Sequence, residues 1–208
     1  MSEQRDKNLW IFNAGNSFAG NPKWMFEYII RHHKEIKPVW MCYNADTMNY
    51  VHKLGYEAEL YHSSKGKSVM AKAGVYVVEM CKEVFQPELS GITVLNLWHG
   101  VGCKSIERKV TDGFLQERIA KKYIQNNDIL RNNQLFLVTS EIMEKHFKEQ
   151  CGIDDDKVIR AGYPRCVVND NIQSYDHDIR KKKGLSANTK LAIYCPTYRD
   201  NNGANFMK

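Results

Sequence analysis

Short apolar runs of the kind that form strands alternate along this chain with longer amphipathic stretches, and this alternation limits the folds open to it. We expect strands at Asn8–Ala14, Pro38–Cys42, Glu57–Tyr61, Val75–Val78, Ile92–Leu97, Leu135–Thr139, Lys157–Ala161 and Lys190–Cys195. We expect helices at Pro22–His33, Asp46–Leu54, Ser64–Ala73, Glu117–Leu130 and Ser140–Gln150. Apolar strands separated by helices are typical of a parallel sheet covered by helices on both faces. The sequence therefore predicts an α/β, Rossmann-like, doubly wound domain.

Single residues indicate where three of these helices begin or end. We expect Asn21 to cap the helix that starts with Pro22, because asparagine accepts hydrogen bonds from a first helical turn and proline suits its first position. Ser140 is expected to cap its helix in the same way. Gly55 is expected to end the second helix, because glycine readily adopts the left-handed conformation found there.

The composition of the chain changes after residue 168. The stretch Asn169–Asn188 is polar and contains the basic cluster Arg180–Lys183, whereas Lys190–Cys195 is again apolar. We therefore expect a Rossmann-like domain over residues 1–168, a linker over residues 169–189 and the start of a second domain over residues 190–208. A solvated helix is the alternative to a linker in the polar stretch.

The composition also argues against several classes of protein. Apolar residues make up 43% of the 208 residues, but no uncharged apolar run reaches the roughly 18 residues that span a bilayer. Met1–Lys7 is polar and unlike a signal peptide, so we expect a cytoplasmic protein in which the six cysteines are free thiols. No spacing of Cys, His, Asp or Glu fits a metal site, so we expect neither a metal nor a cofactor.

The balance of charge favours anionic partners. The chain has 30 Lys and Arg residues against 24 Asp and Glu residues, a formal net charge of +6. Phosphorylated substrates, an anionic membrane surface and nucleic acid all fit this balance, and so does a basic surface with no dedicated partner. We do not expect nucleic-acid binding, because no basic-aromatic stripe or known binding module occurs.

The loop after the first expected strand, Asn13–Lys23, is a candidate phosphate site. Gly15 permits a tight turn, and Gly15 and Asn16 precede a helix whose first N–H groups can bind an anion. The loop matches neither the dinucleotide fingerprint nor the Walker loop, and an ordinary strand-to-helix connection explains it equally well.

The segment Trp98–Lys104 follows an apolar strand and contains the best candidate for acid-base chemistry. His99 can accept a hydroxyl proton, the two following glycines let backbone N–H groups approach a ligand, and Lys104 adds positive charge. A structural histidine is the alternative. We expect no catalytic role for the other histidines, His32, His33, His52, His62, His146 and His177.

Two further segments leave the carboxyl ends of strands with anion-binding side chains. Gly162–Arg165 offers Arg165 after a turn stiffened by proline, and Pro196–Asp200 brings together Thr197, Arg199 and Asp200. These side chains suit phosphate or ribose, although a surface turn with a solvated arginine explains the first segment as well. Because ligands of parallel sheets bind beyond the carboxyl ends of the strands, we expect His99 at such an end, with the cationic side chains around the same opening.

Five motifs taken in order resemble the CDP-glycerol:poly(glycerophosphate) glycerophosphotransferase family, which builds teichoic acids and related capsules. They are Gly15 with Asn21–Tyr28, Lys37–Trp40, Leu97–Lys104, Gly162–Arg165 and Tyr194–Asp200. The resemblance covers nearly the whole chain. It implies a GT-B arrangement, in which this chain is the N-terminal acceptor domain and residues 190–208 begin a truncated donor-binding domain.

The resemblance also implies a reaction and a place for it. Such an enzyme transfers glycerol phosphate, or ribitol phosphate, from a CDP-linked donor to the terminal hydroxyl of a lipid-linked polymer and releases CMP. His99 is then the general base, Lys104, Arg165 and Arg199 stabilise phosphate charge, and Asp200 orients Arg199 or contacts the donor. We expect a peripheral enzyme on the inner face of the cell membrane, and no activity from this chain alone.

Two alternatives to this interpretation remain. One is another nucleotide-sugar transferase of GT-B shape that makes a capsule. The other is a non-catalytic module at the membrane surface, which keeps the acceptor domain but not the chemistry.

Overall fold

The computed structural model describes residues 5–80, 86–102, 105–113, 116–120, 134–167 and 179–194. The chain divides into two compact units, Met1–Val168 and Asn169–Lys208. The first unit holds all the strands that the structure describes.

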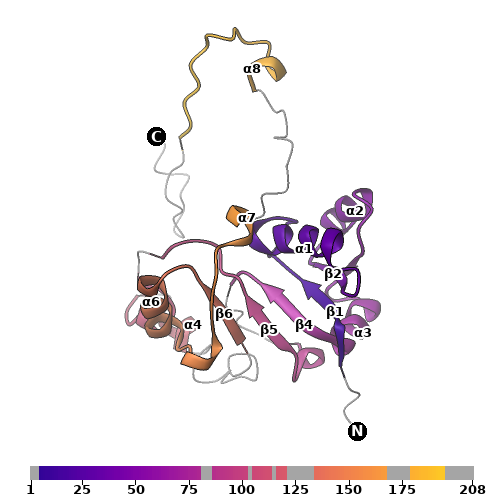
Figure 1. Ribbon diagram of the computed structural model, residues 1–208, viewed down its shortest axis with the longest axis vertical. Coiled ribbons are helices and arrows are strands. Elements are labelled where there is room, and N and C mark those ends of the chain that lie inside the picture. Colours follow the sequence, from indigo (N-terminus) through magenta and orange to yellow (C-terminus); the bar gives the residue numbers. More distant parts are fainter. Residues whose placement is uncertain are drawn as a thin grey trace. The chain divides into compact units, whose positions relative to one another are not determined.

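A single parallel sheet of seven strands forms the centre of the first unit (Figure 1). Its strands are β1 (Asp6–Phe12), β2 (Lys37–Cys42), β3 (Ala58–Leu60), β4 (Ala73–Val78), β5 (Thr93–Asn96), β6 (Gln134–Val138) and β7 (Val158–Arg160). The strand order is β3-β2-β1-β4-β5-β6-β7, and every neighbouring pair is parallel. The order reverses between β1 and β4, and in such sheets this reversal is where ligands bind.

Helices connect these strands at close to the expected positions. They are α1 (Gly20–His32), α2 (Ala45–Lys53), α3 (Ser64–Lys72), α4 (Gln116–Ala120), α6 (Glu141–Cys151) and α7 (Pro164–Val167), with the short 3₁₀ turns η1 (Pro87–Leu89), η2 (Glu107–Lys109) and η4 (Asp155–Lys157). The helix expected over Glu117–Leu130 begins as α4, and residues 121–130 lie outside the described residues. The predicted α/β fold class is confirmed.

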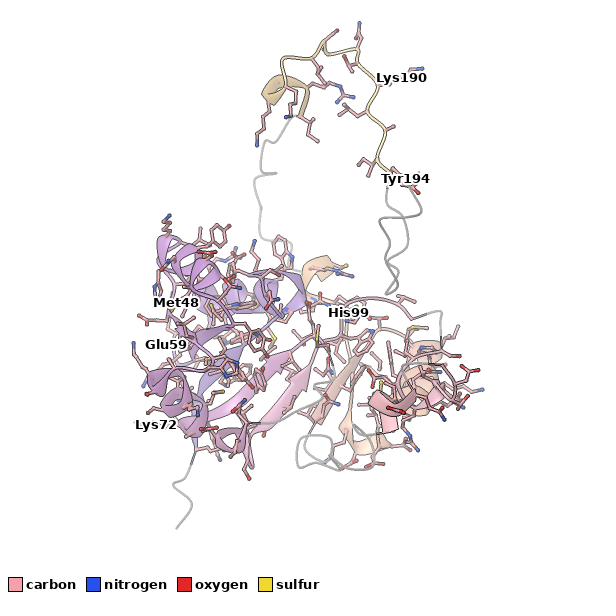
Figure 2. The ribbon with its side chains drawn as sticks, turned by 180° about the vertical axis from the view of Figure 1, so that it is seen from behind. Met48, Glu59, Lys72, His99, Lys190 and Tyr194 are labelled. Carbon is pink, nitrogen blue, oxygen red and sulfur yellow. The ribbon has the colours of Figure 1, made fainter. Side chains whose placement is uncertain are left out.

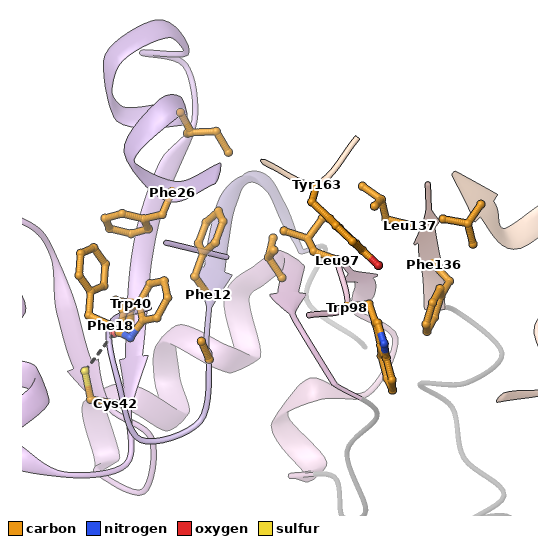
Figure 3. Packing of buried hydrophobic residues seen from close by; sticks show 14 of the residues in the cluster. Phe12, Phe18, Phe26, Trp40, Cys42, Leu97, Trp98, Phe136, Leu137 and Tyr163 are labelled. Carbon is orange, nitrogen blue, oxygen red and sulfur yellow. Dashed lines mark hydrogen bonds between the residues drawn. The ribbon is translucent and has the colours of Figure 1, made fainter. Parts of the chain in front are cut away.

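Two apolar clusters form the core, and they separate onto opposite faces of the sheet at β1 and β4, whereas the first cluster includes residues from both faces of β6. Successive strand residues point to opposite faces, so Phe12 belongs to one cluster and Ile11 to the other. Helices α1 and α2 cover the face of Phe12 with Phe26 and Val51, and α3 and η1 cover the face of Ile11 with Met70 and Leu89. Phe147 of α6 packs on Phe136 of β6, which the strand register places on the face of Ile11. Figure 3 shows the first cluster extending from Phe26 and Trp40 to Trp98 and Phe136. Burying each such side chain contributes about 1.5–3 kcal/mol.

The helix ends confirm two of the three expected caps. Ser140 accepts a hydrogen bond from the Met143 amide at the start of α6, and Gly55 follows α2 in the left-handed conformation (φ 81°). The expectation for Asn21 is wrong. Ala19 holds the cap position of α1 without a side-chain hydrogen bond, and Asn21 lies inside the first turn and is fully buried.

Arg5 binds the backbone at the edge of the sheet where strands begin. Its guanidinium donates to the carbonyl oxygens of Met70 (2.9 Å), Ala73 (2.7 Å), Glu88 (2.7 Å) and Ser90 (2.6 Å). These carbonyls lie at the end of α3, the start of β4 and the η1 turn. Arg5 therefore joins three segments at the edge opposite the carboxyl ends of the strands.

The cysteines within the described ranges are free thiols, as expected: Cys42 and Cys151 are buried and Cys166 is exposed. Burial, helped by the charge of Glu59, raises the pKa of the Cys42 thiol to about 11. A thiol with so high a pKa is a poor nucleophile at neutral pH, which agrees with a purely structural role for Cys42.

The second unit contains α8 (Ile179–Lys182), and Lys190–Tyr194 after it is exposed and forms no strand. The expectation of a strand at Lys190–Cys195 is thus wrong for its described residues. An apolar run needs a neighbouring strand for its hydrogen bonds, and the described part of this unit holds none. Among the helices of the described ranges, none has the length and apolar content that crossing a bilayer requires.

Candidate functional site

His99 lies beyond the carboxyl end of β5, and its side chain is exposed. Figure 2 shows it at the edge of the sheet opposite Lys72, the last residue of α3. Trp98 before it is buried and has a left-handed backbone (φ 51°), which is uncommon for a bulky residue. The two rings stack with centroids 4.5 Å apart. This turn carries the chain out of the core, with the imidazole resting on a buried indole.

The tautomer of His99 follows from its hydrogen bond. The ring atom Nδ1 lies 2.8 Å from the backbone oxygen of Glu79, which directly follows β4. A carbonyl oxygen can only accept a hydrogen bond, so Nδ1 must donate and therefore holds the proton. The neutral imidazole then has its lone pair on Nε2, which is the form that a general base requires.

Arg165 lies beside His99. Its Nη2 donates to the backbone oxygen of His99 at 2.9 Å, and its guanidinium carbon lies 5.6 Å from the ring centre of Tyr163. The Tyr163 hydroxyl in turn donates to the carbonyl of Gly100 at 2.8 Å. Two segments that are far apart in sequence thus meet, and they bring an imidazole and a guanidinium together.

The start of α1 already holds a carboxylate. The Asn21 amide donates to Oε2 of Glu79 at 3.2 Å, and a side chain at Gly20 (φ 69°) would overlap that carboxylate. We expected this helix start to receive a ligand anion. Glu79 thus takes up the backbone amide of Asn21, and anion binding by the other groups of this loop stays a prediction.

Gly15 and Asn16 lie at the same edge of the sheet, on the β2 side. Gly15 has the left-handed backbone that its turn requires (φ 65°), and its amide donates to Oδ1 of Asn13 at 3.1 Å. The Asn16 carbonyl accepts from the hydroxyl of Thr47 (2.8 Å) and from the side chain of Asn44 (3.5 Å). These contacts join the loop to the start of α2 rather than to His99 or Arg165.

The remaining expected site residues are outside the described ranges. They are Lys104, Thr197, Arg199 and Asp200. Their roles stay predictions. Within the described ranges, no group of three or more His, Cys, Asp or Glu side chains is arranged to hold a metal ion.

Sequence reasoning missed three residues of this site: Asn21, Glu79 and Tyr163. Glu79 directly follows a strand. Because the same position marks His99 as a candidate, the sequence does contain a signal for Glu79. Tyr163 lies in the Gly162–Arg165 motif, where Arg165 carries the stronger signal for anion binding. The sequence around Asn21 indicates a local helix cap and gives no sign of its distant partners.

Comparison with known proteins identifies relatives over nearly the whole chain. A model of the CDP-Glycerol:Poly(glycerophosphate) glycerophosphotransferase family matches residues 1–208. The teichoic acid poly(glycerol phosphate) polymerase of Bacillus subtilis (strain 168) is 25% identical over 200 residues, which cover 89% of this chain and 25% of that protein. The polymerase of the same name from Bacillus spizizenii is 21% identical and is covered to 51%.

Solved structures of a related enzyme share the fold. A structure of the wall teichoic acid polymerase TagF superposes with a TM-score of 0.74 at 19% identity, over 94% of this chain and 49% of that one. A TagF variant soaked with CDPG gives a TM-score of 0.75 and covers 96% of this chain. The chain therefore spans between a quarter and about half of the length of these relatives.

Proposed function

The chain belongs to the CDP-glycerol:poly(glycerophosphate) glycerophosphotransferase family, and on this premise we propose that it forms the acceptor half of a polyol-phosphate transferase. The reaction moves glycerol phosphate, or ribitol phosphate, from a CDP-linked donor to the terminal hydroxyl of a teichoic-acid-like polymer. CMP is the second product. The observation that supports this proposal most is the hydrogen bond from Arg165 to the His99 carbonyl at the carboxyl edge of the sheet.

His99 is the general base in this proposal. Nε2 accepts the proton of the acceptor hydroxyl, and the hydroxyl oxygen then forms a bond to the phosphorus that bears glycerol. The bond from that phosphorus to the CMP oxygen breaks, and CMP leaves with the electron pair. The hydrogen bond from Nδ1 to Glu79 supports this role, since it stabilises the ring as its second nitrogen takes up the proton.

Arg165 stabilises the phosphate charge that is redistributed during transfer. A guanidinium has five N–H donors in a planar fork, and the bond to the His99 carbonyl uses one of them. A phosphate oxygen next to the reacting hydroxyl is therefore within reach of the same side chain. Lys104, Thr197, Arg199 and Asp200 stay predicted phosphate-binding residues, as do Gly15 and Asn16 on the acceptor side.

In the proposed enzyme, acceptor binding and donor binding belong to different parts of the chain. Residues 1–168 bind the lipid-linked acceptor at the inner face of the membrane, residues 169–189 form a linker, and residues 190–208 begin the donor-binding domain. The net charge of +6 supports contact with anionic lipid. The curated relatives are two to four times as long as the matched region, which supports a donor half outside this chain.

The proposal is tested by assaying the complete protein that contains this chain. Given CDP-glycerol or CDP-ribitol and a lipid-linked polyol-phosphate acceptor in vesicles, it should release CMP and lengthen the acceptor. Anionic vesicles should support a faster rate than neutral vesicles of equal acceptor content, because the basic surface concentrates the enzyme at them. The isolated 208-residue chain should release no CMP.

Each alternative gives a different result in this assay. Transfer from a UDP-sugar in place of a CDP-polyol indicates a capsule transferase. Binding to anionic vesicles without release of CMP from any donor indicates a non-catalytic module and contradicts the proposal. Equal rates in the two kinds of vesicle contradict the membrane contact only.

A further inference from the structure

We propose that Asn21 is a positioning residue that sets the geometry between His99 and Arg165; this inference rests on the proposed function. Asn21 is the second residue of α1, and none of its surface is exposed. It is a buried polar side chain next to both proposed reacting groups, although it is itself out of reach of a substrate. Its contacts explain why an asparagine lies there.

One side-chain amide joins the two segments of the site. Its Nδ2 donates to the backbone oxygens of Trp98 (2.7 Å) and Leu97 (3.4 Å). Its Oδ1 accepts from the backbone amide of Arg165 at 3.4 Å. The backbone amide of Asn21 also donates to Glu79, the residue whose carbonyl fixes the tautomer of His99.

The contact to Trp98 holds a costly backbone conformation in place. A left-handed backbone is unfavourable for a bulky residue and persists only when the surrounding structure enforces it. The amide of Trp98 donates to Oδ1 of Asn96 at 2.9 Å, and its carbonyl accepts from Asn21. Two buried asparagines therefore hold the peptide groups on either side of Trp98. His99 is the next residue, so this turn determines where the imidazole points.

The chemistry of the amide is matched to its three partners. A backbone carbonyl needs a donor and a backbone amide needs an acceptor, and only a side chain with both groups satisfies them at once. An ionised aspartate of the same shape would place an oxygen 2.7 Å from the Trp98 carbonyl with no proton between them. Asn21→Asp is therefore the sharpest test, because it changes the donor without changing the volume.

We expect Asn21→Asp to lower kcat for CMP release by about 10- to 100-fold in the complete protein, with a smaller change in KM. A displacement of about 1 Å at a reacting group costs rates of this order. Combined with His99→Ala, the substitution should add little to the loss caused by His99→Ala alone, because both act on the same step. Asn21→Ser, which keeps a hydroxyl donor and acceptor, should recover part of the rate.

Arg5→Ala is the matched control. Arg5 also donates to several backbone carbonyls, but at the opposite edge of the sheet. This variant should melt at a lower temperature and keep the wild-type rate per folded molecule. If Asn21→Asp does not fold, Asn21→Ser replaces it in the combination with His99→Ala.

The outcomes separate this inference from the function that it rests on. The positioning role is overturned if the rate loss of the double variant equals the product of the two single losses. It is also overturned if Asn21→Asp keeps the normal rate and only melts at a lower temperature, as Arg5→Ala should. Either result leaves the proposed transferase function intact. If His99→Ala itself leaves the rate unchanged, the proposed function fails. A large loss for Asn21→Asp that is absent in the His99→Ala background supports the inference.

Discussion

Replacing His99 by alanine should lower the rate of polyol-phosphate transfer at least ~10²-fold in the complete protein, as loss of a general base usually does. The reason is that Nε2 of His99 is the proposed acceptor of the hydroxyl proton. The side chain is exposed, so its removal leaves no cavity in the core. The rate of CMP release at saturating acceptor measures the effect. The melting temperature should fall only slightly, through loss of the hydrogen bond to Glu79 and the stack on Trp98.

His62→Ala is the control for this substitution. His62 is also exposed and also follows a strand at the carboxyl edge of the sheet, but it lies beyond β3 at the far side, where its ring contacts Tyr43 and Tyr61. It should keep the full rate. Equal losses in the two variants would show that neither imidazole acts as the base.

Replacing Arg165 by alanine should lower kcat by about 10²- to 10³-fold, the cost of removing one preorganised group that stabilises charge in a transition state. The variant loses the proposed contact to phosphate and the bond to the His99 carbonyl. Arg165→Lys keeps the charge but not the planar fork, so it should recover only part of the rate. Steady-state kinetics of CMP release for the three proteins measures both effects.

Arg31→Ala is the matched control for Arg165. Arg31 is an exposed arginine whose Nε donates to a backbone carbonyl, that of Glu27, at 3.1 Å. It lies in the last turn of α1, away from the carboxyl edge of the sheet. A normal rate in Arg165→Ala, or the same loss in Arg31→Ala, would contradict a specific role for Arg165 at the phosphate.

The inner strands β1, β2, β4, β5 and β6 could be predicted because each contains a short apolar run with buried residues, whereas the edge strands β3 and β7 are shorter and less buried. The run at Lys190–Cys195 has the same composition but forms no strand over its described residues. The composition of a segment determines whether it can form a strand. Whether it does so depends on a neighbouring strand with which it can form hydrogen bonds. The cap expected at Asn21 failed for a similar reason. Its hydrogen bonds reach 77 and 144 residues along the chain, beyond any local rule.

The site could be predicted in part. The rule that parallel strands present their carboxyl ends at one edge was enough to group His99 with Arg165. The same rule did not show that Gly15 and Asn16 contact α2, since position along an edge depends on strand order. The partner of the His99 ring is a main-chain carbonyl, which every residue has, so no residue type indicates it.

The tautomer of His99 tests the account most directly, because a base at Nε2 requires the proton on Nδ1. Nitrogen-15 NMR of the isolated chain, with the ring signals assigned by comparison with a His99→Gln variant, measures the position of that proton at a pH where the ring is neutral. We predict that Nδ1 holds the proton and that Nε2 has the shift of an unprotonated nitrogen. A neutral ring with its proton on Nε2 would contradict the account.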